Sequence, residues 1–155
     1  MTESQEIEIL LVEDNPDDLD MTLFALRRAN LANRIQVARD GAEALDFIFG
    51  GQSNGHLRLN EDLKVILLDL KLPKVDGLEV LRRLKSDART RHIPVVMLTS
   101  SREQRDMIES YQLGVNSYIV KPVNFESFAA AVQKLGMYWL LLNQHPQDHT
   151  AAHRL

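Results

Sequence analysis

The sequence predicts an α/β protein in which a five-stranded parallel sheet carries helices on both faces. Five short aliphatic runs alternate with segments whose apolar residues recur at helical spacing. One run, Val65-Ile66-Leu67-Leu68, has four consecutive aliphatic residues, which is typical of a strand buried on both faces of a parallel sheet. Polar residues follow these runs directly, at the strand ends where α/β proteins bind ligands.

Residues 7–12 predict the first strand, and the helix that follows is predicted over 16–29. Pro16 suits the first turn of a helix, and Asp17 and Asp18 suit its positive N-terminal end. Apolar residues at helical spacing then define the expected buried stripe. This stripe consists of Leu19, Leu23 and Leu26, with Phe24 beside them.

The second strand and helix are shorter. Residues 33–38 alternate as a less buried strand does, and a helix is predicted over 40–50 with its apolar residues inward. The polar segment 52–62 is predicted to be an exposed loop, because it contains turn-forming residues and no helical or strand pattern.

The second half of the chain repeats the alternation. Pro73 ends pairing after the 65–68 strand, because proline has no N–H to donate. Val75, Leu78, Leu81 and Leu84 mark the third helix. The remaining predicted elements are a strand over 93–98, a helix over 102–113, a strand over 117–120 and a helix over 125–135.

For five strands in this arrangement we expect the flavodoxin-like, doubly wound order 2-1-3-4-5, which places the first and third strands side by side. Glu13 and Asp14 after the first strand would then meet Asp69 after the third. Three carboxylates in one cleft repel one another and favour a hard cation with oxygen ligands, for which magnesium is suited. Together with a hydroxyl after the fourth strand and a lysine after the fifth, this set favours phosphoryl transfer onto Asp69.

Composition and charge exclude several classes of function for this chain. The chain has 155 residues, 45% hydrophobic and 26% charged, which fits one globular domain. A formal net charge of −4 provides no basic footprint for nucleic acid, and no cysteine is present. No apolar run approaches the ~20 residues that span a bilayer, and the polar N-terminus does not match a signal peptide. We expect a cytoplasmic protein that binds neither nucleic acid nor membrane.

Five motifs occur in order and together resemble the receiver domain of two-component response regulators, over about residues 7–135. They are Val12-Glu13-Asp14, Leu68-Asp69-Leu70-Lys71-Leu72-Pro73, Asp76-Gly77, Leu98-Thr99-Ser100 and Tyr118-Ile119-Val120-Lys121-Pro122. Residues 12–18, together with Tyr138-Trp139-Leu140, resemble more narrowly the stand-alone regulators associated with bacterial phytochrome histidine kinases.

The resemblance implies roles for particular motif residues. Asp69 would accept a phosphoryl group from a histidine of a partner sensor kinase, with a bacterial phytochrome as the narrower candidate. Mg²⁺ would bind to Asp14 directly, to Glu13 mostly through water, to Asp69 and to the backbone carbonyl of Lys71. Lys121 would pair with Asp69 and then with phosphoryl oxygens, while Thr99 would bind the phosphoryl group and Tyr118 would swing inward.

The chain would then be a single-domain signalling switch or phosphorelay intermediate rather than an enzyme, with a downstream phosphotransfer or target protein as a further partner. Two rivals remain. A receiver-like binding module would not depend on phosphate, against which the intact Asp14, Asp69, Thr99 and Lys121 argue. A haloacid-dehalogenase-like phosphatase would need an acid two residues after the nucleophile, where this chain has Lys71.

The C-terminal part departs from a minimal receiver. We expect one receiver domain over 1–143, with an extended helix or arm over 136–143 and a flexible tail over 144–155. The apolar segment 136–142 either finishes the core or buries against a second subunit, and we favour a homodimer through this C-terminal face. His145, His149 and His153 have helical metal-site spacing, but Pro146 and the terminal position favour an unstructured tail.

Overall fold

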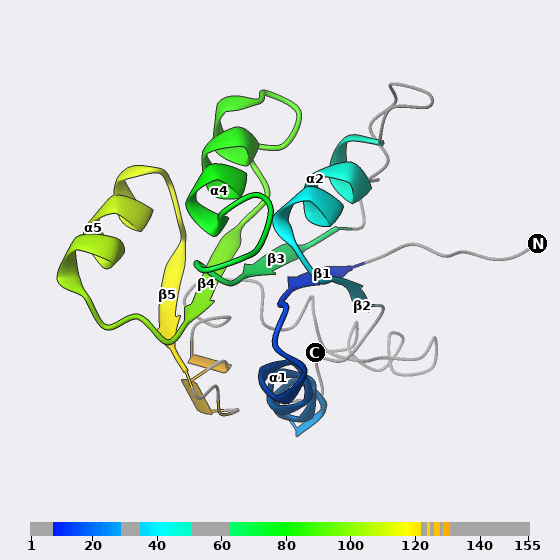
Figure 1. Ribbon diagram of the computed structural model, residues 1–155, viewed down its shortest axis with the longest axis vertical. Coiled ribbons are helices and arrows are strands. Elements are labelled where there is room, and N and C mark those ends of the chain that lie inside the picture. The colour runs from blue at the N-terminus through cyan, green and yellow to red at the C-terminus, as the bar shows by residue number, and fades with distance from the viewer. Residues whose placement is uncertain are drawn as a thin grey trace, which may run out of the picture.

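The predicted α/β fold is confirmed in a computed structural model that describes residues 8–28, 35–50, 63–121, 124, 126–127 and 129–130. Its five strands are all parallel and lie in the order β2-β1-β3-β4-β5 (Figure 1). The strands are β1 Ile9–Val12, β2 Ile35–Ala38, β3 Val65–Leu68, β4 Val95–Thr99 and β5 Ser117–Val120. The helices are α1 Pro16–Arg28, α2 Gly41–Phe49, α4 Gly77–Ser86 and α5 Gln104–Gln112.

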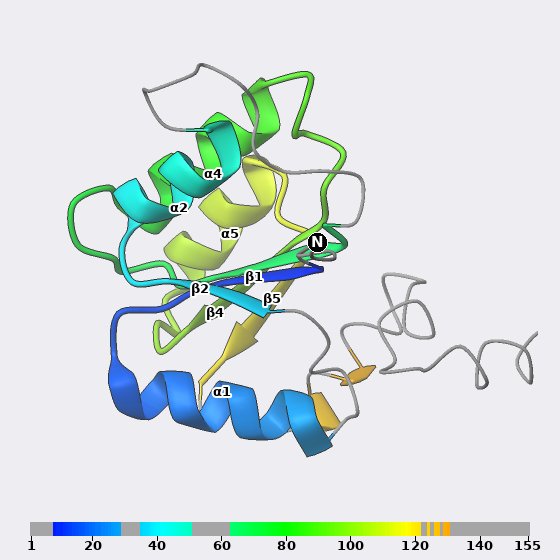
Figure 2. The same ribbon diagram turned by 90° about the vertical axis from the view of Figure 1, so that its right-hand side faces the viewer.

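Helices cover both faces of the sheet. Figure 2 shows α1 on one face and α2, α4 and α5 on the other. Alternate residues of a strand point to opposite faces, so the sheet divides the apolar core in two. Ile9 and Leu11 pack with α1 residues such as Leu26, whereas Leu10 and Val12 pack with residues of α2 and α4.

Short-range hydrogen bonds fix where the helices begin and end. Asp40 caps α2, because its side chain accepts a hydrogen bond from the backbone N–H of Glu43 at 2.7 Å. Gly50 ends the same helix in the left-handed region, with φ of 83°. The side chain of Asn15 accepts from the N–H of Asp18 at 2.9 Å, which satisfies one free donor at the start of α1.

Two expectations about packing were wrong. Val75 lies outside α4, which begins at Gly77 because the chain first makes a loop after β3 and the N–H of Gly77 donates to the carbonyl of Leu70 at 2.9 Å. Phe24 is 60% exposed. The inward stripe of α1 is instead made by Leu19, Thr22, Ala25 and Leu26.

Several predictions fall on residues outside the described part of the chain. These are the exposed loop at 52–62, the arm at 136–143 and the tail at 144–155 with its three histidines. Of the helix predicted over 125–135, the four residues at 126, 127, 129 and 130 are described, and all four are helical. In the described part of the chain, none of the helices has the length and apolar content needed to span a bilayer.

Candidate functional site

The carboxyl ends of four strands deliver the predicted site residues to one edge of the sheet. Val12 is in register with Leu68, so Glu13 and Asp69, the residues that follow them, emerge side by side. The N–H of Asp69 donates to the carbonyl of Val12 at 3.1 Å, which holds the two strand ends together. The N–H of Lys121 donates in the same way to the carbonyl of Thr99 at 2.8 Å.

Three carboxylates gather at this edge. Glu13, Asp14 and Asp69 each offer an oxygen atom, and these atoms lie within 4.8 Å of one another. Glu13 and Asp69 are buried, whereas Asp14 is exposed. Burial and mutual repulsion both disfavour the charged forms of such a group, so a compensating cation is required.

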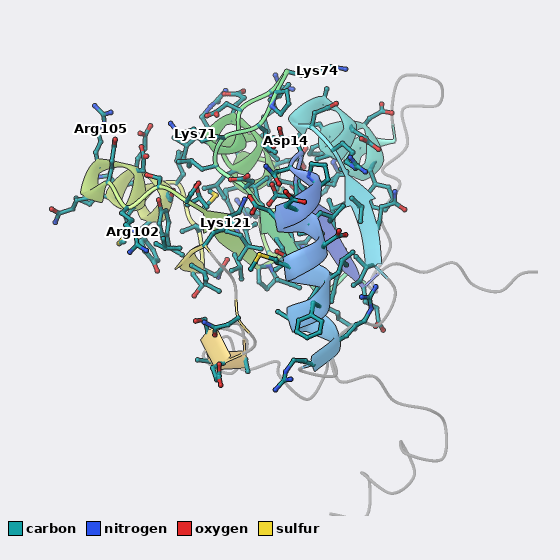
Figure 3. All side chains as sticks on the ribbon, turned by 60° about the horizontal axis from the view of Figure 1, so that its bottom comes forward. Asp14, Lys71, Lys74, Arg102, Arg105 and Lys121 are labelled. Atoms are coloured by element: carbon teal, nitrogen blue, oxygen red, sulfur yellow. The ribbon has the colours of Figure 1, made fainter. Side chains whose placement is uncertain are left out.

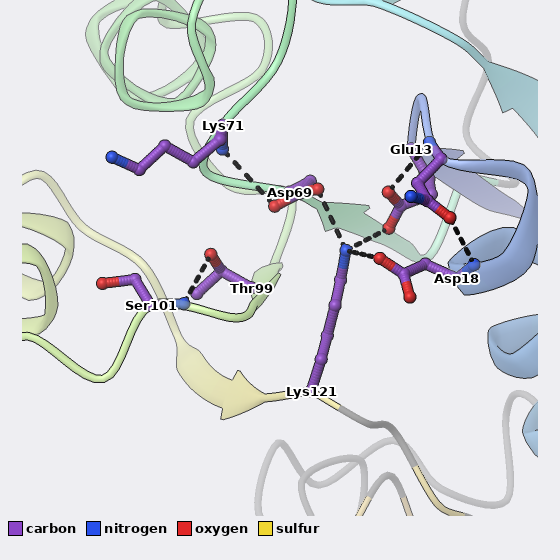
Figure 4. A network of polar contacts seen from close by, with 8 residues as sticks. Glu13, Asp18, Asp69, Lys71, Thr99, Ser101 and Lys121 are labelled. Atoms are coloured by element: carbon purple, nitrogen blue, oxygen red, sulfur yellow. Dashed lines mark hydrogen bonds and ion pairs between the residues drawn. The ribbon is translucent and has the colours of Figure 1, made fainter.

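Lys121 is one such cation, and it contacts carboxylates from three elements (Figure 4). Its Nζ lies 2.7 Å from Glu13 Oε1, 2.9 Å from Asp18 Oδ2 and 3.0 Å from Asp69 Oδ2. The contacts with Asp18 and Asp69 are also aligned as hydrogen bonds. Burial alone would lower the pKa of Lys121, but these carboxylates outweigh it and raise the pKa. Lys121 therefore stays charged.

The carboxylate of Glu13 has fewer aligned hydrogen bonds than the ammonium group of Lys121. Its Oε2 accepts from the N–H of Asn15 at 3.3 Å, but Oε1 is buried and has no aligned hydrogen-bond donor among the described residues. Burial raises the pKa of Glu13 to about 7, opposed by Lys121 and reinforced by the charge of Asp69. The contact of Oε1 with Lys121 at 2.7 Å is therefore an ion pair without an aligned hydrogen bond, which leaves hydrogen-bonding capacity unused on a buried oxygen.

This environment fits a divalent cation. The donor set consists of carboxylate oxygens, which hard cations such as Mg²⁺ prefer. Within the described residues, the buried Glu13 Oε1 has an ion pair with Lys121 but no aligned hydrogen bond. Lys121 supplies a single positive charge against the carboxylates of Glu13, Asp14, Asp18 and Asp69. The remaining negative charge is what a divalent ion would neutralise.

Thr99 and Tyr118 meet through Ser101. Thr99 is fully buried, and its Oγ1 accepts from the N–H of Ser101 at 3.2 Å. The hydroxyl of Tyr118 donates to the carbonyl of Ser101, also at 3.2 Å. Ser101 Oγ in turn donates to Asp106 Oδ2 of α5 at 2.6 Å. The end of β4 is thus connected to both β5 and α5.

The loop after β3 holds Asp69 from its other side. The N–H of Lys71 approaches Asp69 Oδ1 at 3.4 Å, while the Lys71 side chain points to solvent. A Cβ atom at Gly77 would lie 2.1 Å from the carbonyl oxygen of Asp69, so only glycine lets α4 approach this closely. Around the site, Figure 3 shows Lys71, Lys74, Arg102 and Arg105 further out than Asp14 and Lys121.

Comparison with known proteins decides the family. Residues 9–133 match the family described as response regulator receiver domain. The chain belongs to this family. It is 41% identical over 138 residues to a probable methanogenesis regulatory protein, FilR2, of Methanothrix harundinacea, covering 89% of this chain and 86% of that protein. It is 38% identical over 132 residues to the response regulator Rcp1 of Synechocystis, covering 85% and 88%.

Solved structures agree with the narrower resemblance. The bacteriophytochrome response regulator AtBRR is 57% identical, with a TM-score of 0.75 and coverage of 90% of this receiver domain chain and 99% of that one. The bacteriophytochrome response regulator RtBRR is 51% identical, with a TM-score of 0.78 and coverage of 96% and 90%. This receiver domain is therefore similar to bacteriophytochrome response regulators.

Sequence reasoning missed one member of the receiver domain's polar network. Asp18 was expected only to favour the N-terminus of α1, yet its carboxylate lies 2.9 Å from Lys121 Nζ. A signal was available, because Asp18 follows Asp14, the second residue of the acid pair Glu13-Asp14, by four residues on a helix that begins at the same strand end. Its distance from Lys121 depends on how α1 is placed, which the sequence pattern does not specify.

Proposed function

We propose that Asp69 accepts a phosphoryl group from a phosphohistidine of a partner kinase in a Mg²⁺-dependent step, and that this modification operates the receiver as a switch. The observation that carries the proposal is the buried Asp69 carboxylate, which has Lys121 Nζ at 3.0 Å and the acid pair beside it. A carboxylate nucleophile next to a fixed cation is the arrangement that phosphoryl transfer onto aspartate requires.

The side chains of this chain divide the work of the transfer. A carboxylate oxygen of Asp69 attacks phosphorus, a P–O bond forms, and the P–N bond breaks with its electron pair left on the imidazole nitrogen. Lys121 offsets charge on the phosphoryl oxygens from its present contact with Asp69 Oδ2. Thr99 turns its hydroxyl away from the N–H of Ser101 and toward a phosphoryl oxygen. Because the carbonyl of Ser101 accepts the hydrogen bond from Tyr118, this movement also changes the contact with Tyr118.

Glu13, Asp14, Asp69 and the backbone carbonyl of Lys71 would hold the Mg²⁺ ion. When bound, the ion supplies positive charge that stabilises the phosphoryl oxygens during transfer. The unsatisfied Glu13 Oε1 and the exposed Asp14 support this assignment, since one is already desolvated and the other is open to solvent.

The partner would be a sensor histidine kinase, and the similarity to bacteriophytochrome response regulators supports a bacterial phytochrome. A phosphohistidine must reach Asp69, so the kinase must dock around the site. The helix α1 begins there and exposes Met21 and Phe24 beside a groove of about 740 Å³. Outside this groove, Lys71 and Lys74 after β3, Arg102 after β4 and Arg105 in α5 are exposed basic side chains at the edge of the sheet that carries Asp69 (Figure 3).

The test is phosphorylation with and without Mg²⁺, first with acetyl phosphate and then with a panel of histidine kinases that includes a bacterial phytochrome. Intact-mass analysis should find one added phosphoryl group, which Asp69→Asn abolishes and excess chelator prevents. Asp76→Asn, a carboxylate on the surface at the start of α4, is the matched control and should label normally. Labelling that survives Asp69→Asn would refute the assignment.

The proposal also covers the domain bounds and the oligomeric state of the protein. We propose one receiver domain over 1–143 with a tail over 144–155, and a homodimer whose interface includes residues 136–142. The apolar character of that segment supports an interface, because contiguous exposed apolar surface is rare on monomers.

A further inference from the structure

Asp18 is a third carboxylate partner of Lys121 that phosphoryl transfer does not need. Its Oδ2 accepts a hydrogen bond from Lys121 Nζ at 2.9 Å, slightly shorter than the 3.0 Å contact with Asp69. The ammonium group of Lys121 has carboxylates on three sides, and the contacts with Asp18 and Asp69 are aligned hydrogen bonds. Because this group has only three N–H donors, a phosphoryl oxygen that binds Lys121 competes with these carboxylates, and one of them gives way.

The position of Asp18 is set by the fold. Asn15 caps α1 through its side chain and the N–H of Asp18, and the N–H of Asn15 donates to Glu13 Oε2. The acid pair, the cap and Asp18 thus form one connected segment at the start of α1. This segment directs the Asp18 carboxylate at Lys121, which comes from the other end of the sequence.

Burial decides which partner gives way. The side chains of Glu13 and Asp69 are 1% and 8% exposed, whereas that of Asp18 is 35% exposed. A buried carboxylate that loses its cation pays a large desolvation penalty, but a partly exposed one regains water. Asp69 also receives the phosphoryl group itself, so it stays next to Lys121. Asp18 is the partner that can be exchanged at least cost.

We infer that Asp18 is a positioning residue that competes with the phosphoryl group for Lys121. In the unphosphorylated protein it holds Lys121 and adds a negative charge to the pocket. Both effects oppose the binding of a phosphoryl group or its mimics. Removing the charge of Asp18 therefore strengthens the phosphoryl-binding state. This inference rests on the proposed phosphoacceptor role of Asp69.

The test measures the affinity of the full chain for beryllofluoride at saturating Mg²⁺. Binding is detected through the amide chemical shifts of residues 99–101. Asp18→Asn should bind about five-fold more tightly than wild type, as expected when one partly exposed ion pair no longer competes. The matched control is Asp17→Asn, which makes the same charge change in the same helical turn at an exposed position. It should bind like wild type.

A second measurement asks whether the effect passes through Lys121. Acetyl phosphate labelling rates, read by intact mass, should rise in Asp18→Asn, and this rise should disappear in a Lys121→Met background. A purely structural role of Asp18 would leave the effect unchanged in that background. Asp18→Ser removes the same charge with a smaller side chain, and it replaces Asp18→Asn if thermal unfolding shows that variant to be unfolded.

The outcomes separate the two proposals. If wild type neither labels nor binds beryllofluoride, the phosphoacceptor role of Asp69 fails. If wild type does both but Asp18→Asn matches Asp17→Asn, or binds more weakly than wild type, the competition role of Asp18 is refuted while the phosphoacceptor role stands.

Discussion

Glu13 illustrates, at the scale of one residue, how burial and charge act against each other. Its carboxylate is almost fully buried beside Lys121, yet one oxygen has no aligned donor in the part of the chain that the structure describes. Burial is the larger influence and raises its pKa to about 7, while Lys121 opposes the shift. The residue is therefore poised between its neutral and charged forms near neutral pH, until a cation favours the charged form.

The raised pKa of Glu13 predicts that the stability of the metal-free protein depends on pH. Because the pKa of Glu13 is about 7 when folded and 4.5 ordinarily, the folded state holds the proton more tightly. The resulting contribution to the free energy of unfolding is fully present below pH 4.5 and is lost as the pH rises through 7. Urea unfolding with chelator, at about pH 5 and about pH 8, should show this loss in wild type and a smaller one in Glu13→Gln. An equal loss in both would show that Glu13 is not its source.

A second residue-scale prediction concerns the metal. Asp14→Ala should abolish measurable Mg²⁺ binding by calorimetry, whereas Glu13→Ala should weaken it less, because Asp14 is proposed to bind the ion directly and Glu13 through water. Asp17→Ala, an exposed acid nearby, serves as the control for a general loss of negative charge. Wild-type affinity in Asp14→Ala would contradict the proposed ligand set.

At the scale of elements, the loop between β3 and α4 is held by close backbone contacts. Gly77 has room for no Cβ atom, since it would lie 2.1 Å from Asp69 O and 2.6 Å from Leu70 O. The N–H of Gly41, at the start of α2, approaches the carbonyl of Pro73 at 3.3 Å. Two helix starts therefore set the path of the loop that follows the phosphoacceptor.

Gly77→Ala should accordingly destabilise the fold by about 3 kcal/mol, as overpacking against backbone does. Gly114→Ala is the comparison, because its φ of 108° is unfavourable for alanine but its nearest neighbour is a flexible lysine side chain at 3.1 Å. That variant should cost about 1 kcal/mol. Denaturant unfolding measures both, and equal losses would show that the close approach at Gly77 is relaxed at little cost.

The link from β4 to β5 and α5 leads to a further prediction. Thr99→Ala should still be phosphorylated, but it should not transmit the change to Ser101, Tyr118 and α5, because no hydroxyl follows the phosphoryl group. Amide hydrogen exchange over residues 100–121, with and without beryllofluoride, should respond in wild type and in Thr99→Ser but not in Thr99→Ala. A wild-type response in Thr99→Ala would place the coupling elsewhere.

At the scale of the whole molecule, the proposed homodimer depends on the apolar segment 136–142. A buried Trp covers on the order of 200 Å², and at ~25 cal/mol per Å² the apolar residues of 136–142 would contribute several kcal/mol on docking. Association entropy offsets much of this gain, so we expect a dimer of micromolar rather than nanomolar affinity.

Sedimentation equilibrium of the full chain should find this dimer, and Trp139→Glu should shift it to monomer without loss of thermal stability. Gln144→Glu makes a charge change just beyond the segment and should leave the dimer intact. A monomeric wild type whose Trp139→Glu variant is unstable would instead assign the segment to the core.

The sequence by itself determined the class of fold, the strand order and which residues follow each strand. It could do so because strand and helix periodicities are local, and because parallel strands bring their carboxyl ends to one edge whatever the loops do. Glu13, Asp14, Asp69 and Lys121 were predicted together on that ground, with a hydroxyl after the fourth strand that the resemblance to receiver domains identified as Thr99. The tertiary structure decided what depends on distance and on the orientation of helices. The exposure of Phe24, the start of α4 at Gly77 and the pairing of Asp18 with Lys121 follow from how helices pack and how a loop closes. Residues 18 and 121 are far apart in the chain, so no local pattern could have shown that they share a hydrogen bond.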